Sequence, residues 1–286
     1  MELAAYLQEK REIIDQYLTE KLPSEKEAPA LIHRSMRYSV LNGGKRLRPI
    51  LTLMTAELLG KPYELVLPAA AGIELIHCFS LVHDDLPCMD NDDYRRGKLT
   101  NHKVFGEAVA LLTGDALLVL GLEYIRQNAE VEGVSKESAV KAIQKTLEML
   151  GTRKMLGGQI DDINWQLQKQ SEAKIIDIYL KKTSALICAA LEIGGLLAQA
   201  NVGELSALHS FGEKIGLAFQ ITDDVLDFEK DKKSPDKPSY PATFGIKKSL
   251  AEIKRYCREA KESLSLFENK AKYFLELVDY VQYRKE

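Results

Sequence analysis

The sequence has no excess of charge of either sign, and this sets the first limits on its function. Of its 286 residues, 39 are basic and 42 are acidic, so the formal net charge is only −3. Without a global basic field the chain is not expected to bind nucleic acid, and without an acidic excess it is not expected to be disordered. A function that depends on charge must therefore use locally concentrated charges.

Targeting segments, membrane spans and cysteine motifs are missing too. Residues 1–6 show neither the basic nor the apolar region of a signal peptide. The most apolar long segment, Thr183–Gly203, is interrupted by Glu192 and Gln199, so we expect a buried core helix there and no membrane span. The four cysteines have neither metal-site nor disulfide spacing. We therefore expect a reduced, soluble, cytoplasmic protein.

Proline is absent from the middle of the chain. None of the nine prolines lies between Pro87 and Pro235, and this stretch is rich in Ala, Leu, Glu, Lys and Gln. Strong helix formers without a helix breaker predict helices, and the apolar residues recur in helical stripes, as in residues 111–125. Linkers and short repeats are not found. We predict an all-α fold, a single-domain helical bundle over residues 1–286.

Two acidic clusters each follow an apolar stretch. They are Asp84, Asp85 and Asp90 after residues 69–79, and Asp223, Asp224 and Asp227 after residues 215–221. Carboxylates beside an apolar run cost free energy unless a cation or water meets them, and neighbouring aspartates repel each other. A single DDxxD is commonly a solvated helix end, whereas two such clusters with basic residues nearby favour cation sites.

The spacing within each cluster predicts how its carboxylates converge. Asp223 and Asp227 are four apart and share one face of a helix. Asp84 and Asp90 are six apart and would not share a face, but Pro87 should end or bend the helix so that Asp90 folds back to Asp84. Oxygen-only ligands that leave room for water and phosphate suit Mg²⁺ better than zinc.

Basic residues provide the complementary charge. Residues 42–49 (NGGKRLRP) place two glycines and three cations ahead of a helix expected to start at Pro49, which is the composition of a phosphate cradle but also of ordinary turns. Arg95 and Arg96 follow the first acidic cluster and could hold a diphosphate. Lys181–Thr183 is expected to open a helix, where such residues are more often surface than site residues.

An ordered set of motifs covers residues 42–245, about two-thirds of the chain. It reads GGKRLRP, ELIHxxSLxHDDLPxMDxDDxRRG, TNHxxFGE, GDALL, GGQ, KT, FQxxDDxLD and KxxYPA. In this order the motifs resemble those of trans-isoprenyl diphosphate synthases, and most closely those of bacterial farnesyl diphosphate synthases (geranyltranstransferases). The second DDxxD distinguishes the chain from related terpene cyclases.

The resemblance implies a helical bundle of the isoprenoid synthase type with a central active-site cavity, three Mg²⁺ ions, and condensation of isopentenyl diphosphate with dimethylallyl or geranyl diphosphate. It implies metal binding by Asp84, Asp90 and Asp223, with Asp85, Asp224 and Asp227 as supporting carboxylates of the metal site. It assigns the allylic diphosphate to Arg95, Lys182 and Lys237, with Thr183 in the KT motif. It assigns isopentenyl diphosphate to Gly44, Lys45, Arg48, His77 and Arg96, flanked by Phe219 and Gln220.

The chemistry of such a condensation agrees with these residue types. Ionisation of an allylic diphosphate separates a carbocation from an anionic leaving group, and fixed cations around the leaving group stabilise this separation. A side chain that could act as general base is not obvious, and in the family the departing diphosphate is thought to take the proton. A lone His on an apolar helix is usually a core residue, but His77 lies seven residues before Asp84, on the same helix face.

One segment departs from the family pattern. The family usually has two lysines after the second DDxxD, separated by a loop, whereas here Lys237 has the spacing of the first and the Tyr-Pro context of the second. The loop between them is expected to be deleted, which affects turnover and closure more than the type of reaction. Residues 280–286 also resemble the family only loosely.

Product length and assembly leave alternatives. Ser80 and Phe79 lie four and five residues before Asp84, roughly 6 to 7.5 Å along a helix, and the bulky Phe79 favours a C15 product. The alternatives are a geranylgeranyl diphosphate synthase and a non-catalytic subunit of a heteromeric synthase, although such subunits typically lose an acidic cluster. A homodimer is expected from the family.

Overall fold

Helices make up nearly all the regular structure of the protein, and the all-α prediction is confirmed. The computed structural model describes residues 2–165, 171–231 and 239–284. The α-helices are α1 (Glu2–Lys21), α2 (Ala30–Val40), α3 (Leu47–Leu58), α4 (Leu67–Asp84), α5 (Asn101–Phe105), α6 (Glu107–Gln127), α7 (Lys136–Leu150), α8 (Met155–Ile163), α9 (Glu172–Tyr179), α10 (Ala185–Leu197), α11 (Val202–Asp231), α12 (Tyr240–Phe244), α13 (Ile246–Ser263) and α14 (Lys272–Tyr283). Shorter helical turns are η1 (Tyr63–Val66), η2 (Asn128–Glu130), η4 (Leu180–Ser184) and η5 (Ser265–Ala271).

The chain packs as two units that are described separately. The first comprises residues 1–57 and 61–143, and the second residues 58–60 and 144–286, so that α7 contributes to both. The expectation of one domain over residues 1–286 stays a prediction.

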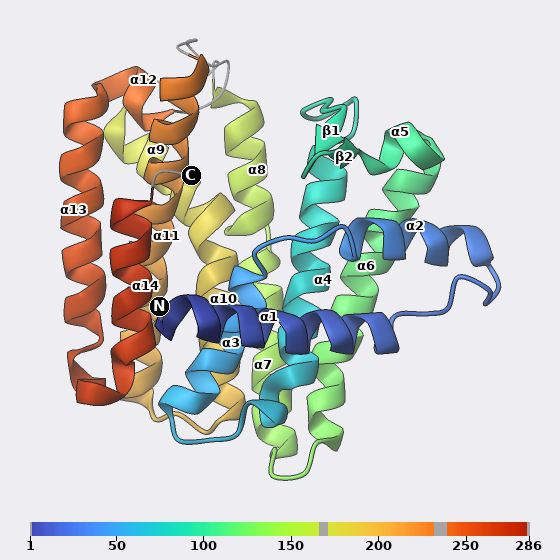
Figure 1. Ribbon diagram of the computed structural model, residues 1–286, viewed down its shortest axis with the longest axis horizontal. Helices are drawn as coiled ribbons and strands as arrows, with labels where there is room; N and C mark the ends of the chain where they lie inside the picture. The colour runs from blue at the N-terminus through green and yellow to red at the C-terminus, as the bar shows by residue number, and fades with distance from the viewer. Residues whose placement is uncertain (1, 166–170, 232–238, 285–286) are drawn as a thin grey trace. The chain divides into compact units, whose positions relative to one another are not determined.

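In the first unit α4 and α6 run side by side (Figure 1). Both helices have a glycine where they meet, and the backbones approach tightly there, because a Cβ atom added to Gly72 would lie 2.5 Å from the carbonyl oxygen of Gly121. Beyond the C-terminal end of α4 the chain forms a short antiparallel hairpin of β1 (Tyr94–Arg95) and β2 (Lys98–Leu99). Gly97, with φ of +76°, makes its turn.

In the second unit α10 is the central helix, with every residue buried except Leu196. It packs against α11, which also contacts α13 and α14 (Figure 1). The apolar segment Thr183–Gly203 therefore contains a core helix, as predicted. Two other segments, Tyr63–Asp84 and Glu107–Glu130, are long and apolar enough to cross a membrane by length and composition alone, a property shared with core helices of soluble proteins.

A widened helical turn connects α9 to α10. Residues Leu180–Ser184 form a π-helix, η4, that continues directly from α9 into α10. The prediction that Lys181–Thr183 opens a helix is therefore wrong, because the helix begins at Glu172, where the Ser171 side chain accepts a hydrogen bond from the Lys174 N–H. Single π-turns within helices are frequent at functional sites.

Candidate functional site

The first acidic cluster has the folded-back geometry that its sequence predicts. Helix α4 ends at Asp84, and the backbone N–H of Asp90 donates to the Asp84 carbonyl at 2.8 Å. Asn91, with φ of +53°, donates to the Leu86 carbonyl at 3.1 Å and closes the loop. The two predicted metal ligands, Asp84 and Asp90, are thereby held next to each other and half-buried.

Asp85 is directed towards a cation of the same unit. Its side chain is 4% exposed, and its Oδ1 accepts from Nε and Nη2 of Arg95, each at 2.6 Å. Burial raises the pKa of Asp85 to about 6, although Arg95 acts in the opposite direction. These contacts fit a supporting carboxylate that orients Arg95, whereas direct metal binding by Asp85 stays a prediction.

Four of the residues predicted to bind isopentenyl diphosphate come together in the first unit, two from residues 42–49 (Gly44 and Arg48) and two from elsewhere (His77 and Arg96). Gly44 has φ of +130°, and a Cβ atom there would lie 2.6 Å from the guanidinium carbon of Arg96. Arg96 also donates to the Gly43 carbonyl. Arg48 Nη1 lies 3.3 Å from His77 Nε2. Burial lowers the pKa of His77 most, and the positive charges of Arg48 and Arg96 lower it further, so that the pKa lies well below its usual value and the ring is neutral.

Two other residues of this segment have different roles. Lys45 is exposed. Arg46, counted among the cations of the cradle, is 2% exposed and donates to Asp15, Glu74 and the Val40 carbonyl, each at 2.7 Å. The expectation that Arg46 adds to a phosphate cradle is therefore wrong, because it is an internal cation that joins α1, α2 and α4.

The residues predicted to limit product length lie at the end of α4. Phe79 is 7% exposed, and its ring centroid lies 5.0 Å from that of His83. His83 in turn contacts α6, with Nε2 3.0 Å from the Leu111 carbonyl. Ser80 is half-buried and donates to the His77 carbonyl at 2.9 Å. Phe79 is thus on the side of α4 that packs towards α6, and its role in product length stays a prediction.

The second acidic cluster lies on α11, in the second unit. Asp223 and Asp227 are one turn apart and accessible, as the helical spacing predicts. Asp224 instead accepts hydrogen bonds from the Tyr179 hydroxyl, from Gln220 Nε2 at 2.9 Å and from the Tyr240 N–H at 3.1 Å. Burial raises the pKa of Asp224 to about 6 against these hydrogen bonds. These contacts fit a supporting carboxylate, and that role of Asp224 stays a prediction.

The widened turn η4 presents two of the predicted binding residues. Lys182 forms an ion pair with Asp162 of α8. Thr183 Oγ1 donates to Gln220 Oε1 at 2.7 Å, which links η4 to the helix of the second acidic cluster. Lys237, the remaining cation assigned to the allylic diphosphate, lies outside the described residues.

The residue at the end of α14 reaches the second acidic cluster. Arg284 pairs with Asp223, and its guanidinium carbon lies 4.1 Å from the ring centroid of Phe219. Sequence reasoning missed three residues that contact predicted site residues: Arg284, Asp162 and Tyr179. A local signal existed only for Asp162, which lies three residues after the GGQ motif.

These carboxylates fit a hard divalent cation such as Mg²⁺. Asp84 with Asp90, and Asp223 with Asp227, offer only oxygen ligands. Asp223 already attracts a cation within the protein, the Arg284 guanidinium. Within residues 2–165, 171–231 and 239–284, no three His, Cys, Asp or Glu side chains are close enough to hold a metal by themselves. Remaining ligands would come from water or a diphosphate.

Comparison with known proteins gives a consistent picture. Residues 29–270 match the family described as polyprenyl synthetase. A geranylgeranyl diphosphate synthase of Cyanophora paradoxa is 40% identical over 98% of this chain and 95% of its own. A dimethylallyltranstransferase of Fischerella ambigua is 41% identical over 98% and 83%.

Solved structures are similar over nearly the whole chain. An FPP/GFPP synthase from Zymomonas mobilis has a TM-score of 0.90 and 32% identity, covering 99% of each chain. A geranyltransferase from Legionella pneumophila has a TM-score of 0.89 and 33% identity, covering 98% of this chain and 96% of that one.

Proposed function

Because the chain belongs to the polyprenyl synthetase family and is a short-chain prenyltransferase, we propose that it condenses isopentenyl diphosphate with dimethylallyl or geranyl diphosphate to farnesyl diphosphate. The observation that carries this proposal is the geometry at the end of α4. There Asp90 folds back to Asp84, and the neighbouring Arg95 is held in place by the buried Asp85.

Asp84, Asp90 and Asp223 would hold Mg²⁺, which when bound supplies positive charge that stabilises a departing diphosphate. Arg95 and Lys182 donate hydrogen bonds to the allylic diphosphate as its C–O bond breaks and the electron pair leaves with the diphosphate.

Isopentenyl diphosphate is assigned to the other basic residues of the first unit. Its diphosphate would be bound by Gly44, Lys45, Arg48, His77 and Arg96. The neutral His77 orients Arg48. The double bond then attacks the allylic cation, a C–C bond forms, and the departing diphosphate accepts the proton that is lost.

The test is incubation of the full chain with both substrates and Mg²⁺, followed by chromatography of the products. Asp84→Ala and Asp223→Ala should each lower turnover by orders of magnitude, because each removes a metal ligand. Circular dichroism should show unchanged helix content. EDTA should abolish activity and Mg²⁺ should restore it, and full activity without a divalent ion contradicts the proposal.

The length of the product has a second candidate. The curated relatives at 38–41% identity include several named geranylgeranyl diphosphate synthases, which favours a C20 product. The bulky, buried Phe79 below Asp84 supports C15. The same chromatography decides between them, since C20 as the main product at short incubation times rejects the C15 proposal.

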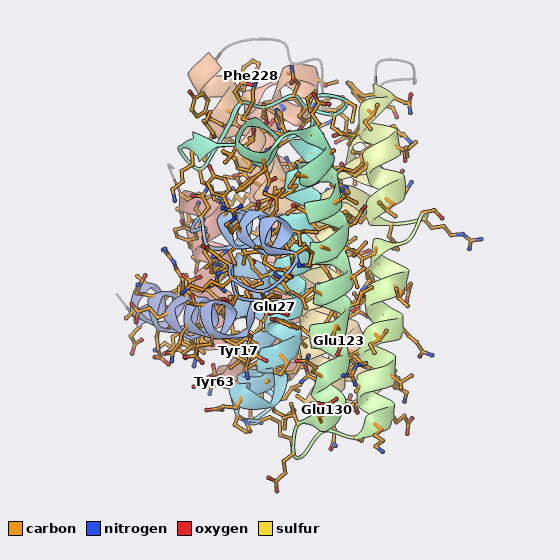
Figure 2. The ribbon with its side chains drawn as sticks, turned by 90° about the vertical axis from the view of Figure 1, so that its right-hand side faces the viewer. Tyr17, Glu27, Tyr63, Glu123, Glu130 and Phe228 are labelled. Atoms are coloured by element: carbon orange, nitrogen blue, oxygen red, sulfur yellow. The ribbon has the colours of Figure 1, made fainter. Side chains whose placement is uncertain are left out.

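We also propose that the protein is a homodimer. Leu111, Leu112 and Val119 form a stripe along α6 and are 48%, 56% and 67% exposed. Figure 2 shows this helix, with Glu123 towards its C-terminal end. Sedimentation velocity should show a dimer for the wild type and a monomer for a variant with Leu112→Glu and Val119→Glu. Val202→Glu, at an 85% exposed residue on a different helix, is the control.

We also propose that the protein works in the reducing cytoplasm. Its four cysteines are free thiols, three of them buried. Thiol titration of the denatured protein, prepared without reductant, should therefore find all four, and a smaller number argues for an oxidising compartment.

A further inference from the structure

We infer that Arg284 is the resident counter-cation of Asp223, a positioning residue that competes with the divalent cation for this carboxylate. The inference rests on the proposed function, in which Asp223 is a metal ligand. It concerns a contact between the end of α14 and the acidic cluster of α11, both in the second unit.

The backbone after α14 turns the arginine back towards α11. Helix α14 ends at Tyr283, and Arg284 has extended backbone angles, with φ of −63° and ψ of 145°. Its N–H donates to the Tyr280 carbonyl at 2.9 Å, which fixes the residue at the end of the helix. Arg284 is therefore held by the fold although only two residues follow it in the given sequence.

The Arg284 guanidinium is almost fully buried but has few hydrogen-bond partners. The side chain is 2% exposed, stacks on Phe219, and donates from Nη2 to the Phe219 carbonyl at 3.1 Å and to Asp223 Oδ1. Arg284 Nε is buried and has no hydrogen-bond partner within the described residues. A buried donor without a partner costs free energy and calls for an explanation.

A second arginine of the same unit shows what an ordinary arrangement looks like. Arg255 lies over the Tyr256 ring at the same distance, 4.1 Å, and pairs with Glu252 and Glu259. Its side chain is 41% exposed, so the pairing takes place largely in water. Arg284 differs because its charge is desolvated and because its carboxylate belongs to an acidic cluster.

Competition follows from the signs of the charges. Asp223 lies beside Asp224 and one turn from Asp227, so the cluster without a metal needs a positive partner. Arg284 is one such partner, and a divalent cation that binds Asp223 must displace the guanidinium or share the carboxylate with it. Arg284 should therefore stabilise the metal-free protein and weaken metal binding to the free enzyme.

The experiment measures the binding of Mn²⁺ to the full-length protein, because carboxylates bind Mn²⁺ as well as Mg²⁺. Electron paramagnetic resonance gives the concentration of free Mn²⁺ in each titration. Arg284→Gln should bind Mn²⁺ roughly tenfold more tightly than the wild type, which corresponds to removal of about 1.4 kcal/mol of competition. Arg284→Lys keeps the charge and should stay near the wild-type affinity. Arg255→Gln is the matched control and should change nothing.

Two further variants keep the test decisive. Arg284→Met keeps an apolar stem over Phe219 and should tighten binding like Arg284→Gln, even if the latter does not fold. Asp223→Asn should weaken Mn²⁺ binding. If Asp223→Asn weakens binding but neither neutral variant at position 284 tightens it, Arg284 is only an anchor for α14 and the inference is wrong. If Asp223→Asn binds Mn²⁺ like the wild type, Asp223 is not a metal ligand and the proposed site itself fails.

Discussion

Replacing Gly44 by alanine should damage the predicted isopentenyl diphosphate site through Arg96. The new methyl group would lie 2.6 Å from the guanidinium carbon and Nη1, so the end of this flexible side chain must move. A hydrogen bond from a charged group contributes about 1.5–3 kcal/mol, so its loss should raise the KM for isopentenyl diphosphate roughly 10- to 100-fold. The assay is steady-state kinetics with isopentenyl diphosphate varied at saturating allylic substrate.

Stability should change much less than substrate binding. A side chain at positive φ costs about 1–3 kcal/mol of folding free energy, and for a chain of this size each kcal/mol lowers Tm by about 2 °C. Gly43→Ala is the matched control, because Gly43 also has positive φ, at +75°, but its added methyl group would meet nothing within 4 Å. It should show a similar Tm loss with a much smaller rise in KM.

A double-mutant cycle isolates the guanidinium. If Gly44→Ala acts by displacing Arg96, then adding it to Arg96→Ala should have little further effect on KM. Additive losses, or equal KM values for the two glycine variants, would refute this reasoning.

Three further predictions concern other parts of the chain. Phe79→Ala should lengthen the product to geranylgeranyl diphosphate or beyond, seen by chromatography; an active variant that still stops at C15 shows that another residue limits the chain. Gly72→Ala should lower the free energy of unfolding by about 3 kcal/mol in urea, because the Gly121 carbonyl cannot move aside, whereas Gly203→Ala should be neutral or stabilising. Hydrogen bonds to Glu192 and Glu213 raise the pKa of His209 from 6.5 to about 9, so the stability that protonated His209 contributes is fully present below pH 6.5 and is lost as pH rises through 9. The Tm difference between wild type and His209→Gln should therefore shrink over that range, and a constant difference contradicts this prediction.

Local features of the fold and site could be predicted from the sequence. Pro87 follows the last turn of α4, and the expected reversal that returns Asp90 to Asp84 is present. The common face of Asp223 and Asp227 and the buried helix α10 follow from helical periodicity alone. Each of these depends on residues within a few positions of one another.

Long-range pairing could not be predicted in the same way. Local sequence gives no reason to assign different roles to Arg46 and Arg48. Arg46 is nevertheless internal, because it pairs with Asp15 and Glu74, which lie 31 and 28 residues away in the sequence. The Arg284 contact with Asp223 spans 61 residues. Nothing in the local composition reports such partners, because they are fixed only by the packing of helices.

The widened turn η4 makes the chain unusually sensitive to the loss of one residue. A π-turn holds one residue more than an α-helical turn, so deleting a single residue from Leu180–Ser184 would let α9 and α10 merge into one regular helix at little cost in stability. Because the turn accommodates its extra residue locally, the flanking helices would keep their faces, and only the side chains within the turn would shift around the helix axis. Lys182 would then no longer point to Asp162. The loss of one codon here is therefore a short mutational route from an active synthase to a folded subunit without activity.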